Sequence, residues 1–348
     1  MRRMKFGVFD HMDEASVPLQ QQFADRLALI EAYDRLGFYA YQLAEHHGTP
    51  LGLAPSPSVL MSAVAQRTRR LRFGPLVYSL PLYHPIRLIE EICMLDHLSN
   101  GRFELGVGRG VSPIEVGFYG VDSAAGSRQF PEALRVIKNG LTSDELSFSG
   151  EFYKFHKVPM VLRPFQKPHP PLWYGISNPD TTHWAALERA SMVTLSPTRG
   201  ARAAIERYKS EWKMLHGAEP ASTFAGVMRL VVLAETTKEA LASARRAYQS
   251  WLGHMRFLWD RHGIPFTLPL PTEFDPMIDS GAAFAGTAAG FRDFIAADAE
   301  AVGANYIACD IAFGDLTFDE SLGTTELLGR EVIPAFDNET IARTARPQ

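Results

Sequence analysis

The feature of this sequence that most constrains its fold is a repeated alternation of strand-like and helix-like segments. Short apolar runs are separated by longer segments whose apolar residues recur at helical spacing. Parallel strands need a crossover between them, so the alternation predicts βα units around a parallel sheet. The predicted strands cover residues 4–9, 38–43, 71–78, 98–110, 172–176, 192–195, 224–234 and 306–311. The predicted helices cover residues 18–37, 55–67, 84–98, 131–141, 179–189, 201–216, 237–262, 291–302 and 321–336.

Eight strands, each followed by a helix, with one helix left over, favour a (β/α)8 barrel. A doubly wound sheet is the alternative, and it would need a reversal of strand order that a sequence does not reveal. We expect one domain over residues 1–348. In residues 144–170, apolar and polar side chains alternate on both sides of a glycine, which predicts a β-hairpin insertion. Residues 263–284 are rich in Pro and Gly without periodicity, which indicates either a mobile lid or a packed excursion.

The composition excludes several classes of function. The net charge of −4, from 35 basic and 39 acidic residues, leaves no basic surface for nucleic acid or an anionic membrane. The two cysteines, Cys93 and Cys309, have neither metal-ligand nor disulfide-framework spacing, which favours a reducing compartment. Residues 1–4 are basic but lead directly into a strand rather than an apolar signal core. We therefore expect a cytoplasmic protein.

The fourth predicted strand has two different faces. Phe103, Leu105 and Val107 point to one side, which suits packing against helices. Gly106 and Gly108 point to the other side, which suits a flat or bulky group pressed against the backbone. This strand is therefore expected to form the floor of a site, with the mouth of the site at its carboxyl end.

Polar and titratable side chains follow most of the predicted strands. In a (β/α)8 barrel the active site is built from residues at the carboxyl ends of the strands, so this distribution predicts a catalytic face. The residues at these positions are Asp10, His11, Glu45, His46, His47, Ser79, Tyr83, His84, Arg109, Ser177, Asn178 and Ser196.

The adjacent residues His46 and His47 cannot both enter one pocket from a strand, because successive side chains point to opposite faces. One of them is expected to belong to the site and the other to be structural. The competing interpretation is a metal site formed by His46 with His11, His84 and Glu45. The absence of His-x-His or His-Glu-x-x-His spacing weakens the metal interpretation.

A turn after the fifth predicted strand carries Ser177 and Thr181, and two interpretations are open for it. These residues are ordinary helix caps in one interpretation. In the other they seat a phosphate at the start of a helix, with Arg109 from the neighbouring strand neutralising its charge. A surface ion pair is the alternative for Arg109. The glycine spacing that precedes it lacks the pattern of a dinucleotide fingerprint.

Three motifs in the first third of the chain, in this order and spacing, resemble the bacterial luciferase-like flavin-dependent monooxygenases. Two later segments, Met192-x-x-Leu195-Ser196 and Gly303-Ala304-Asn305-Tyr306-Ile307, are similar to the same family, and 217–290 is the least similar region. The three motifs are Ala44-Glu45-His46-His47, Leu80-Pro81-x-x-His84-Pro85-Ile-Arg87 and Leu95-Asp96-x-Leu98-Ser99-x-Gly101-Arg102-Phe-x-x-Gly106-x-Gly108-Arg109-Gly110.

This resemblance implies a (β/α)8 barrel that binds FMN, in its reduced form, delivered by a separate NAD(P)H:flavin reductase. Oxygen adds to the flavin at C4a, and the resulting C4a-peroxyflavin oxidises a small organic substrate, aldehyde-like or ketone-like. The resemblance also implies a homodimer formed across early helices. Helix 84–98 could lie partly in that interface or wholly in the core, and the core is the favoured interpretation.

Roles for individual residues follow from the resemblance. His46 corresponds to the catalytic histidine of the family, and Arg109, Ser177 and Thr181 correspond to its phosphate contacts. Ser196, after the sixth predicted strand, joins the expected cofactor-binding set.

Further site residues are expected around the flavin ring. The bond between Leu76 and Val77 resembles a non-proline cis peptide beneath the ring, and Gly108 stands where luciferases carry a reactive cysteine. His11 and Tyr83 are expected to line the substrate pocket, together with the 263–284 segment.

Two other functions stay open at this point. One is a deazaflavin-dependent oxidoreductase on the same scaffold, against which the Glu45-His46-His47 sequence argues. The other is a non-catalytic flavin-binding subunit, against which an intact His46 and Arg109 argue. The sequence does not distinguish among aldehyde, sulfonate, ketone and aromatic substrates.

Overall fold

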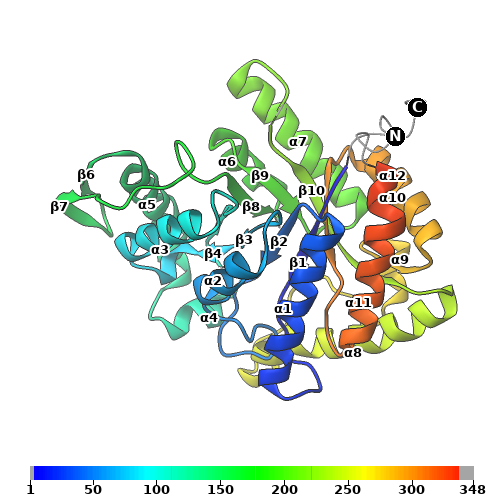
Figure 1. Ribbon diagram of the computed structural model, residues 1–348. Coiled ribbons are helices and arrows are strands. Elements are labelled where there is room, and N and C mark those ends of the chain that lie inside the picture. The colour runs from blue at the N-terminus through cyan, green and yellow to red at the C-terminus, as the bar shows by residue number, and fades with distance from the viewer. Residues whose placement is uncertain (1–3, 111, 177, 221, 337–348) are drawn as a thin grey trace.

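The computed structural model describes residues 4–110, 112–176, 178–220 and 222–336, which form a barrel of parallel strands surrounded by helices (Figure 1). The barrel strands are β1 (Lys5–Asp10), β2 (Ala40–Leu43), β3 (Arg72–Pro75), β4 (Tyr78–Ser79), β5 (Leu105–Gly108), β8 (Leu172–Ile176), β9 (Ser191–Thr194), β10 (Ala225–Leu233) and β12 (Tyr306–Asp310). Around the barrel the strands follow chain order, and β12 pairs with β1. This arrangement confirms the (β/α)8 barrel and excludes the doubly wound sheet.

The barrel closes at the third predicted strand, which the structure divides into β3 and β4. Phe73 of β3 bridges to Phe103, and β4 pairs with β5. The chains approach closely here, since a Cβ at Gly106 would lie 1.9 Å from the carbonyl oxygen of Pro75. Glycine at this position therefore lets the last gap in the sheet close.

Twelve labelled α-helices lie among the described residues, and most of them surround the barrel. Glycines with positive φ end three of them, at Gly37, Gly217 and Gly303. Within the described residues, no helix has the length and apolarity that a bilayer span requires. The helices are α1 (Leu19–Leu36), α2 (Pro57–Arg67), α3 (Pro85–Leu98), α4 (Pro113–Phe118), α5 (Ser123–Thr142), α6 (Thr182–Leu187), α7 (Thr198–His216), α8 (Thr237–Arg261), α9 (Asp275–Asp279), α10 (Ala288–Val302), α11 (Phe318–Leu327) and α12 (Ile333–Phe336), with short turns η1 (Leu80–Leu82), η2 (Pro179–Thr181) and η3 (Leu328–Val332).

The apolar side of the fourth predicted strand is buried as its residues predict. Phe103, Leu105 and Val107 are buried in the cluster that joins the strands to the helices. Burying a side chain of this size contributes about 1.5–3 kcal/mol to stability, so this face holds the strand against the surrounding helices. A separate buried cluster fills the inside of the barrel and consists of Phe9, Ala44, Leu76, Trp173, Val193, Met228, Tyr306 and Ala308.

One helix begins earlier than its sequence pattern indicates. The prediction started a helix at Pro131, because proline favours a first turn. In the structure Pro131 lies inside α5, which begins at Ser123 after the cap residue Asp122. The side chain of Asp122 accepts a hydrogen bond from the N–H of Ala125 at 2.8 Å. The cap therefore sets the start of the helix, and proline is tolerated within it.

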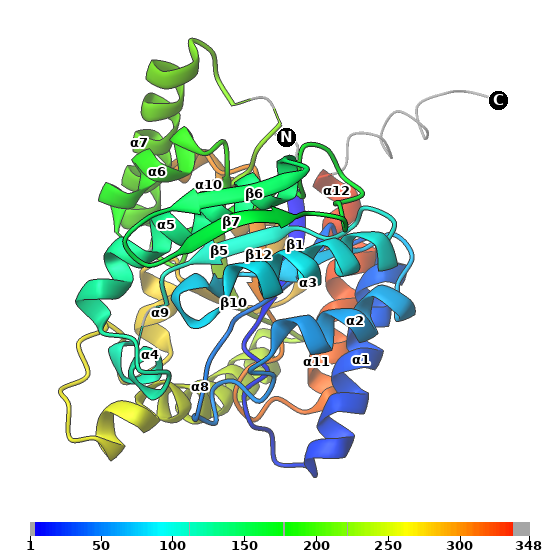
Figure 2. The same cartoon turned by 90° about the vertical axis from the view of Figure 1, so that its left-hand side faces the viewer.

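Two segments lie outside the barrel strands. An antiparallel hairpin of β6 (Glu145–Ser149) and β7 (Lys154–Pro159) falls within the segment predicted for it and packs beside α5 (Figure 2). Residues 263–284 are not uniform. The part up to 270 is mostly exposed, whereas α9 and the extra strand β11 (Ala283–Gly286) pack against α8 and β10. Sequence patterning did not reveal β11, a short Ala- and Gly-containing strand.

Candidate functional site

The candidate site lies at the carboxyl end of the barrel strands, where α4 and α8 also lie (Figure 1). His46 follows β2 and is 9 % exposed. Its Nδ1 lies 3.2 Å from Oε1 and 3.3 Å from Oε2 of Glu115, which comes from α4. The N–H of His47 donates to Oε2 of Glu115 at 2.8 Å. The carboxylate therefore receives two N–H groups from one short segment.

These contacts set the charge of Glu115 and the orientation of His46. Burial raises the pKa of Glu115, but the hydrogen bonds from His46 and from the His47 backbone outweigh burial and leave that pKa below its usual value. An ionised carboxylate at Nδ1 holds the proton of a neutral imidazole on Nδ1. Nε2 of His46 is then a free base, which is the property required of a proton acceptor.

His47 is engaged by a different carboxylate, so the two neighbouring histidines do point to different places. Nε2 of His47 lies 2.9 Å from Oε1 of Glu45, and its Nδ1 lies 2.8 Å from the hydroxyl of Tyr119. The other oxygen of Glu45 accepts from the N–H of Ser79 at 3.1 Å and from the hydroxyl of Tyr83 at 2.8 Å. His47 is thus bonded at both ring nitrogens, as a structural histidine would be.

Tyr83, predicted to line the substrate pocket, instead uses its hydroxyl to hydrogen-bond Glu45 in this network. Burial and the adjacent Glu45 hold the pKa of Tyr83 above its usual value, so the hydroxyl stays a donor. Tyr83 faces Glu45, and its ring packs edge-on against Tyr78 at 5.3 Å between centroids. A small pocket next to this network is lined by Glu45, His46, His47, Ser79, Leu82, Gly110, Ser112, Glu115 and Val116.

The bond between Leu76 and Val77 is cis, as the family resemblance implied. The structure corrects the interpretation of the glycines beside it. A Cβ at Gly108 would lie 2.4 Å from Cγ2 of Val77, and Gly106 lies against the carbonyl of Pro75. The glycines of β5 therefore make room for the neighbouring strand rather than directly for a ligand. A cysteine at Gly108 would have to displace Val77.

The predicted phosphate contacts and the predicted cofactor-binding residue Ser196 follow three adjacent strands. Arg109 follows β5, Thr181 follows β8 and Ser196 follows β9, while Ser177 lies outside the described residues. Arg109 is exposed, and its Nη1 donates to the hydroxyl of Ser127 at 2.9 Å.

The two hydroxyls already have local partners. Thr181 donates to the carbonyl of Asn178 at 2.7 Å and thereby closes the η2 turn. The hydroxyl of Ser196 lies 3.1 Å from that of Thr194. The turn-capping interpretation of Thr181 is therefore satisfied, and it does not conflict with a contact to an anion through the second lone pair.

His11 is buried beside His46 rather than at an open surface. Their rings stack with 5.6 Å between centroids and 30° between planes. Nδ1 of His11 lies 3.3 Å from Oδ2 of Asp310, the last residue of β12. Trp251 of α8 packs edge-on against His11 at 6.1 Å. His84, by contrast, is exposed and packs on Phe155.

The structure reveals site residues that the sequence analysis missed, chiefly Glu115 and Asp310. Glu115 has one local signal, the Ser112-Pro-x-Glu pattern of a helix start, and Ser112 caps α4 by accepting from the N–H of Glu115. No local sequence pattern marks Asp310 apart from its position at the end of a strand. No set of three His, Cys, Asp or Glu side chains within the described ranges is grouped closely enough to hold a metal ion.

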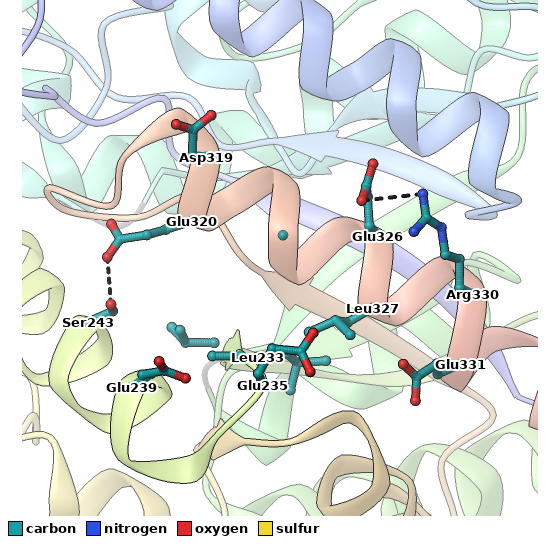
Figure 3. Close-up of a pocket in the computed structure, with 13 residues that line it drawn as sticks. Leu233, Glu235, Glu239, Ser243, Asp319, Glu320, Glu326, Leu327, Arg330 and Glu331 are labelled. Atoms are coloured by element: carbon teal, nitrogen blue, oxygen red, sulfur yellow. Dashed lines mark hydrogen bonds and ion pairs between the residues drawn. The ribbon is translucent and has the colours of Figure 1, made fainter.

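A second cavity, of about 480 Å³, lies outside the barrel between α8 and α11 (Figure 3). Acidic side chains dominate its lining, but several have local partners. Glu320 accepts from the hydroxyl of Ser243 and caps α11, and Glu326 pairs with Arg330. This cavity is therefore explained by helix capping and surface ion pairs.

Comparison with known proteins finds relatives of this chain among the luciferase-like monooxygenases. The family model described as luciferase-like monooxygenase matches residues 4–304. The protein y4wF of Sinorhizobium fredii is 44% identical over 95% of this chain and 97% of that protein. The oxygenase component of the flavin-dependent trigonelline monooxygenase of Acinetobacter baylyi is 31% identical over 56% of this chain and 54% of that protein.

Solved structures share the fold at lower identity. The oxygenating constituent of 3,6-diketocamphane monooxygenase from Pseudomonas putida, in complex with FMN, has a TM-score of 0.80 and 20% identity and covers 95% of this chain and 98% of that one. The coenzyme F420-dependent tetrahydromethanopterin reductase of Methanopyrus kandleri has a TM-score of 0.72 and 18% identity over 96% and 100% of the two chains. The fold alone therefore does not select the cofactor.

Proposed function

This chain belongs to the luciferase-like monooxygenase family, and we propose that it is the oxygenase of a two-component system that uses reduced FMN and O2 to oxidise a small organic substrate. The observation that carries the proposal is the pair of His46 and Glu115, placed at the barrel mouth with Nε2 of His46 left free. The oxygenase component from Acinetobacter, a relative of this chain, supports a separate reductase as partner.

The donors present at the carboxyl end fit a flavin phosphate. Arg109 offers a charged guanidinium, and Thr181 and Ser196 offer hydroxyls from the next two strands. These are the groups that bind phosphate in proteins, and a barrel's carboxyl face is where phosphates are commonly held. Leu76 and Val77 would contact the ring system from the apolar floor. Bound reduced FMN would supply the electrons with which O2 is activated.

The chain's own residues would position and move protons around that cofactor. His46 accepts a proton at Nε2 from the reacting partner, while ionised Glu115 stabilises the imidazolium that forms. The His47–Glu45–Tyr83 network holds the segment after β2 in place. Burial of His46 and its apolar neighbours limits access of water, which strengthens these interactions.

The test is anaerobic binding of reduced FMN, followed by mixing with O2 and a panel of aldehydes and ketones. We expect reduced FMN to bind and 18O from O2 to enter the product. Arg109→Met should weaken FMN binding about 10–100-fold, because it removes a charge-assisted contact to phosphate. Arg128→Met is the matched control, since Arg128 is an exposed arginine paired with Glu151 on the surface.

Deazaflavin dependence is the second candidate, supported by the shared fold of the coenzyme F420-dependent reductase. Tight binding of coenzyme F420, a deazaflavin, without binding of reduced FMN would replace the proposal with this candidate. Binding of FMN without turnover of any substrate in the panel would favour a non-catalytic flavin-binding subunit instead.

We also propose a homodimer formed through α2 and α3, which contact each other. Apolar side chains are exposed along this side: Val59 is 71% and Met94 55% exposed, and Leu98 and Phe165, which packs on His97 of α3, are about half exposed. Clusters of exposed apolar residues mark interaction surfaces. Sedimentation velocity of Met94→Lys would show monomers if this side is the interface, and unchanged dimers would exclude it.

A further inference from the structure

A second histidine–carboxylate pair lies behind His46. His11 follows β1 and Asp310 ends β12, and these neighbouring strands bring Nδ1 of His11 to 3.3 Å from Oδ2 of Asp310. Asp310 is 0% exposed, and neither of its oxygens has an aligned hydrogen bond in the described chain. Nδ1 of His11 has none either. Nδ1 of His11 and the carboxyl group of Asp310 are therefore available to each other as hydrogen-bond partners.

The other charged groups near His11 and Asp310 already have hydrogen-bond or ion-pair partners. Arg26 pairs with Asp10 at 3.1 Å and donates to the carbonyl of Ala312. Asp13 accepts from the N–H of Gly314 at 2.6 Å and lies 3.3 Å from Nδ1 of His254, a group from α8. An ionised Asp310 would add a further buried negative charge here with no cation assigned to it.

Burial of a carboxylate without a partner cation favours the uncharged form of the pair, with the proton on the carboxyl group. Burial raises the pKa of Asp310 well above its usual value, and the negative charge of Asp10 raises it further, more than Arg26 and the backbone N–H of Ala312 lower it. Burial lowers the pKa of His11 to about 4, with His46 adding to the effect, so His11 is neutral at pH 7. A protonated carboxyl group facing Nδ1 makes Nδ1 the acceptor, which leaves the ring proton of His11 on Nε2.

We propose that Asp310 fixes His11 as the Nε2–H tautomer, so that His11 donates a hydrogen bond to an uncharged oxygen of the substrate beside the proton acceptor His46. The proposal rests on the function proposed above, because it assumes that the substrate binds at this end of the barrel. Asp310 is a positioning residue in this scheme, and His11 determines specificity.

The chemistry selects a class of substrate. A carbonyl oxygen accepts a hydrogen bond and carries no proton of its own, so a ketone or an aldehyde matches a neutral N–H donor. A hydrocarbon of the same shape would leave the buried N–H of His11 without an acceptor. A site with such a donor therefore binds the hydrocarbon less tightly than the ketone. Phe9 and Trp251 pack on His11, which is 4% exposed, and keep water from it, which strengthens the hydrogen bond.

The tautomers are the direct test, and they need neither flavin nor turnover. Long-range 1H–15N NMR of protein with 15N-labelled histidine separates Nε2–H from Nδ1–H rings. At pH 7 we expect His11 as Nε2–H and His46 as Nδ1–H. An Nδ1–H ring or an imidazolium at His11 would overturn the proposal, whatever the outcome of FMN binding.

Two substitutions at position 310 test positioning. Asp310→Asn keeps a donor for Nδ1 of His11 and should keep the Nε2–H signature. Asp310→Ala removes the donor and should produce a mixture of the two tautomers. An unchanged Nε2–H signature in Asp310→Ala would show that Asp310 does not set the tautomer.

The specificity is tested with two probes of matched shape, cyclohexanone and methylenecyclohexane. His11→Phe should weaken cyclohexanone binding about tenfold and leave methylenecyclohexane unchanged, whereas His11→Gln, which keeps an N–H, should restore most of the loss. Equal losses for both probes would overturn the donor role. Titrations with and without FMN show separately whether the flavin part of the proposed function fails.

Discussion

The His46–Glu115 and His11–Asp310 pairs contain the same two chemical groups, and their rings stack with 5.6 Å between centroids, yet they hold their protons differently. Glu115 receives N–H groups from His46 and from the His47 backbone, and its pKa lies below the usual value. Within the described residues neither oxygen of Asp310 accepts an aligned hydrogen bond, and burial and Asp10 raise its pKa well above the usual value, more than Arg26 and the N–H of Ala312 lower it. The number of donors given to a buried carboxylate thus decides whether its histidine presents an acceptor or a donor.

Exchanging each histidine for glutamine should separate the two roles most strongly. His46→Gln removes the base at Nε2, and we expect turnover to fall about 10²–10⁴-fold with FMN affinity retained. His11→Gln keeps an N–H donor and should cost about tenfold or less. Single-turnover product formation measures both. Equal losses in the two variants would contradict the division between acceptor and donor.

Replacing each carboxyl group by an amide should lower turnover less than replacing His46, and the two amide variants should still differ from each other. Glu115→Gln removes the anion that orients His46, and we expect turnover to fall about 10–100-fold, the usual cost of losing an orienting partner. Asp310→Asn replaces one uncharged donor by another and should change turnover little. Steady-state kinetics checks both, and a larger loss in Asp310→Asn would mean that Asp310 is ionised.

The fold was predictable because its signals are local and repeated. Strand and helix patterns alternate along most of the chain, whereas the glycines of β5, interpreted as room for a ligand, make room for the neighbouring strand where the barrel closes. The errors arose where tertiary contacts outweigh local pattern. A strand of Ala and Gly such as β11 forms because β10 offers it a partner, and α5 starts at the Asp122 cap rather than at Pro131.

The site was predictable only where a residue follows a strand. His46, His11 and Glu45 could be found in this way. Glu115 is 69 residues from His46 in the chain and enters on the six-residue helix α4, so no spacing rule connects the two. The stacking of His11 on His46 likewise depends on the closure of the barrel. Which carboxylate serves which histidine is a property of the three-dimensional arrangement.

The pH dependence of the free energy of unfolding should also differ between the two pairs. His11 has a pKa of about 4 in the folded protein and about 6.5 when unfolded, so the unfolded chain binds more protons between these values. Its contribution to stability is present above pH 6.5 and is lost as the pH falls toward 4, on the order of 3 kcal/mol in total. Urea unfolding of wild type and His11→Gln from pH 7.5 to 4 measures this loss.

The free energy of unfolding of wild type relative to His11→Gln should therefore fall over that range, because Asp310, whose pKa is raised, contributes the opposite slope in both proteins. Glu115 behaves differently, because its lowered pKa gives a contribution that is present above its unfolded pKa of about 4.3 and is lost only at lower pH. Glu115→Gln should therefore leave the slope between pH 6.5 and 5 unchanged. Parallel slopes in wild type and His11→Gln would show that His11 is not buried as a neutral ring.

The smallest effect is expected at the third pair, His47 with Glu45, which serves as a reference for the other two. His47 is bonded at both nitrogens, and the hydroxyl of Tyr119, a side chain 53% exposed, supplies one of the bonds. Tyr119→Phe removes that hydrogen bond, which contributes about 0.5–1.5 kcal/mol at most and less at an exposed site. We expect a small loss of stability in urea unfolding and no change in the pH profile of turnover. A shifted profile would mean that His47 exchanges protons during the reaction, and the site would then contain three active histidines rather than two.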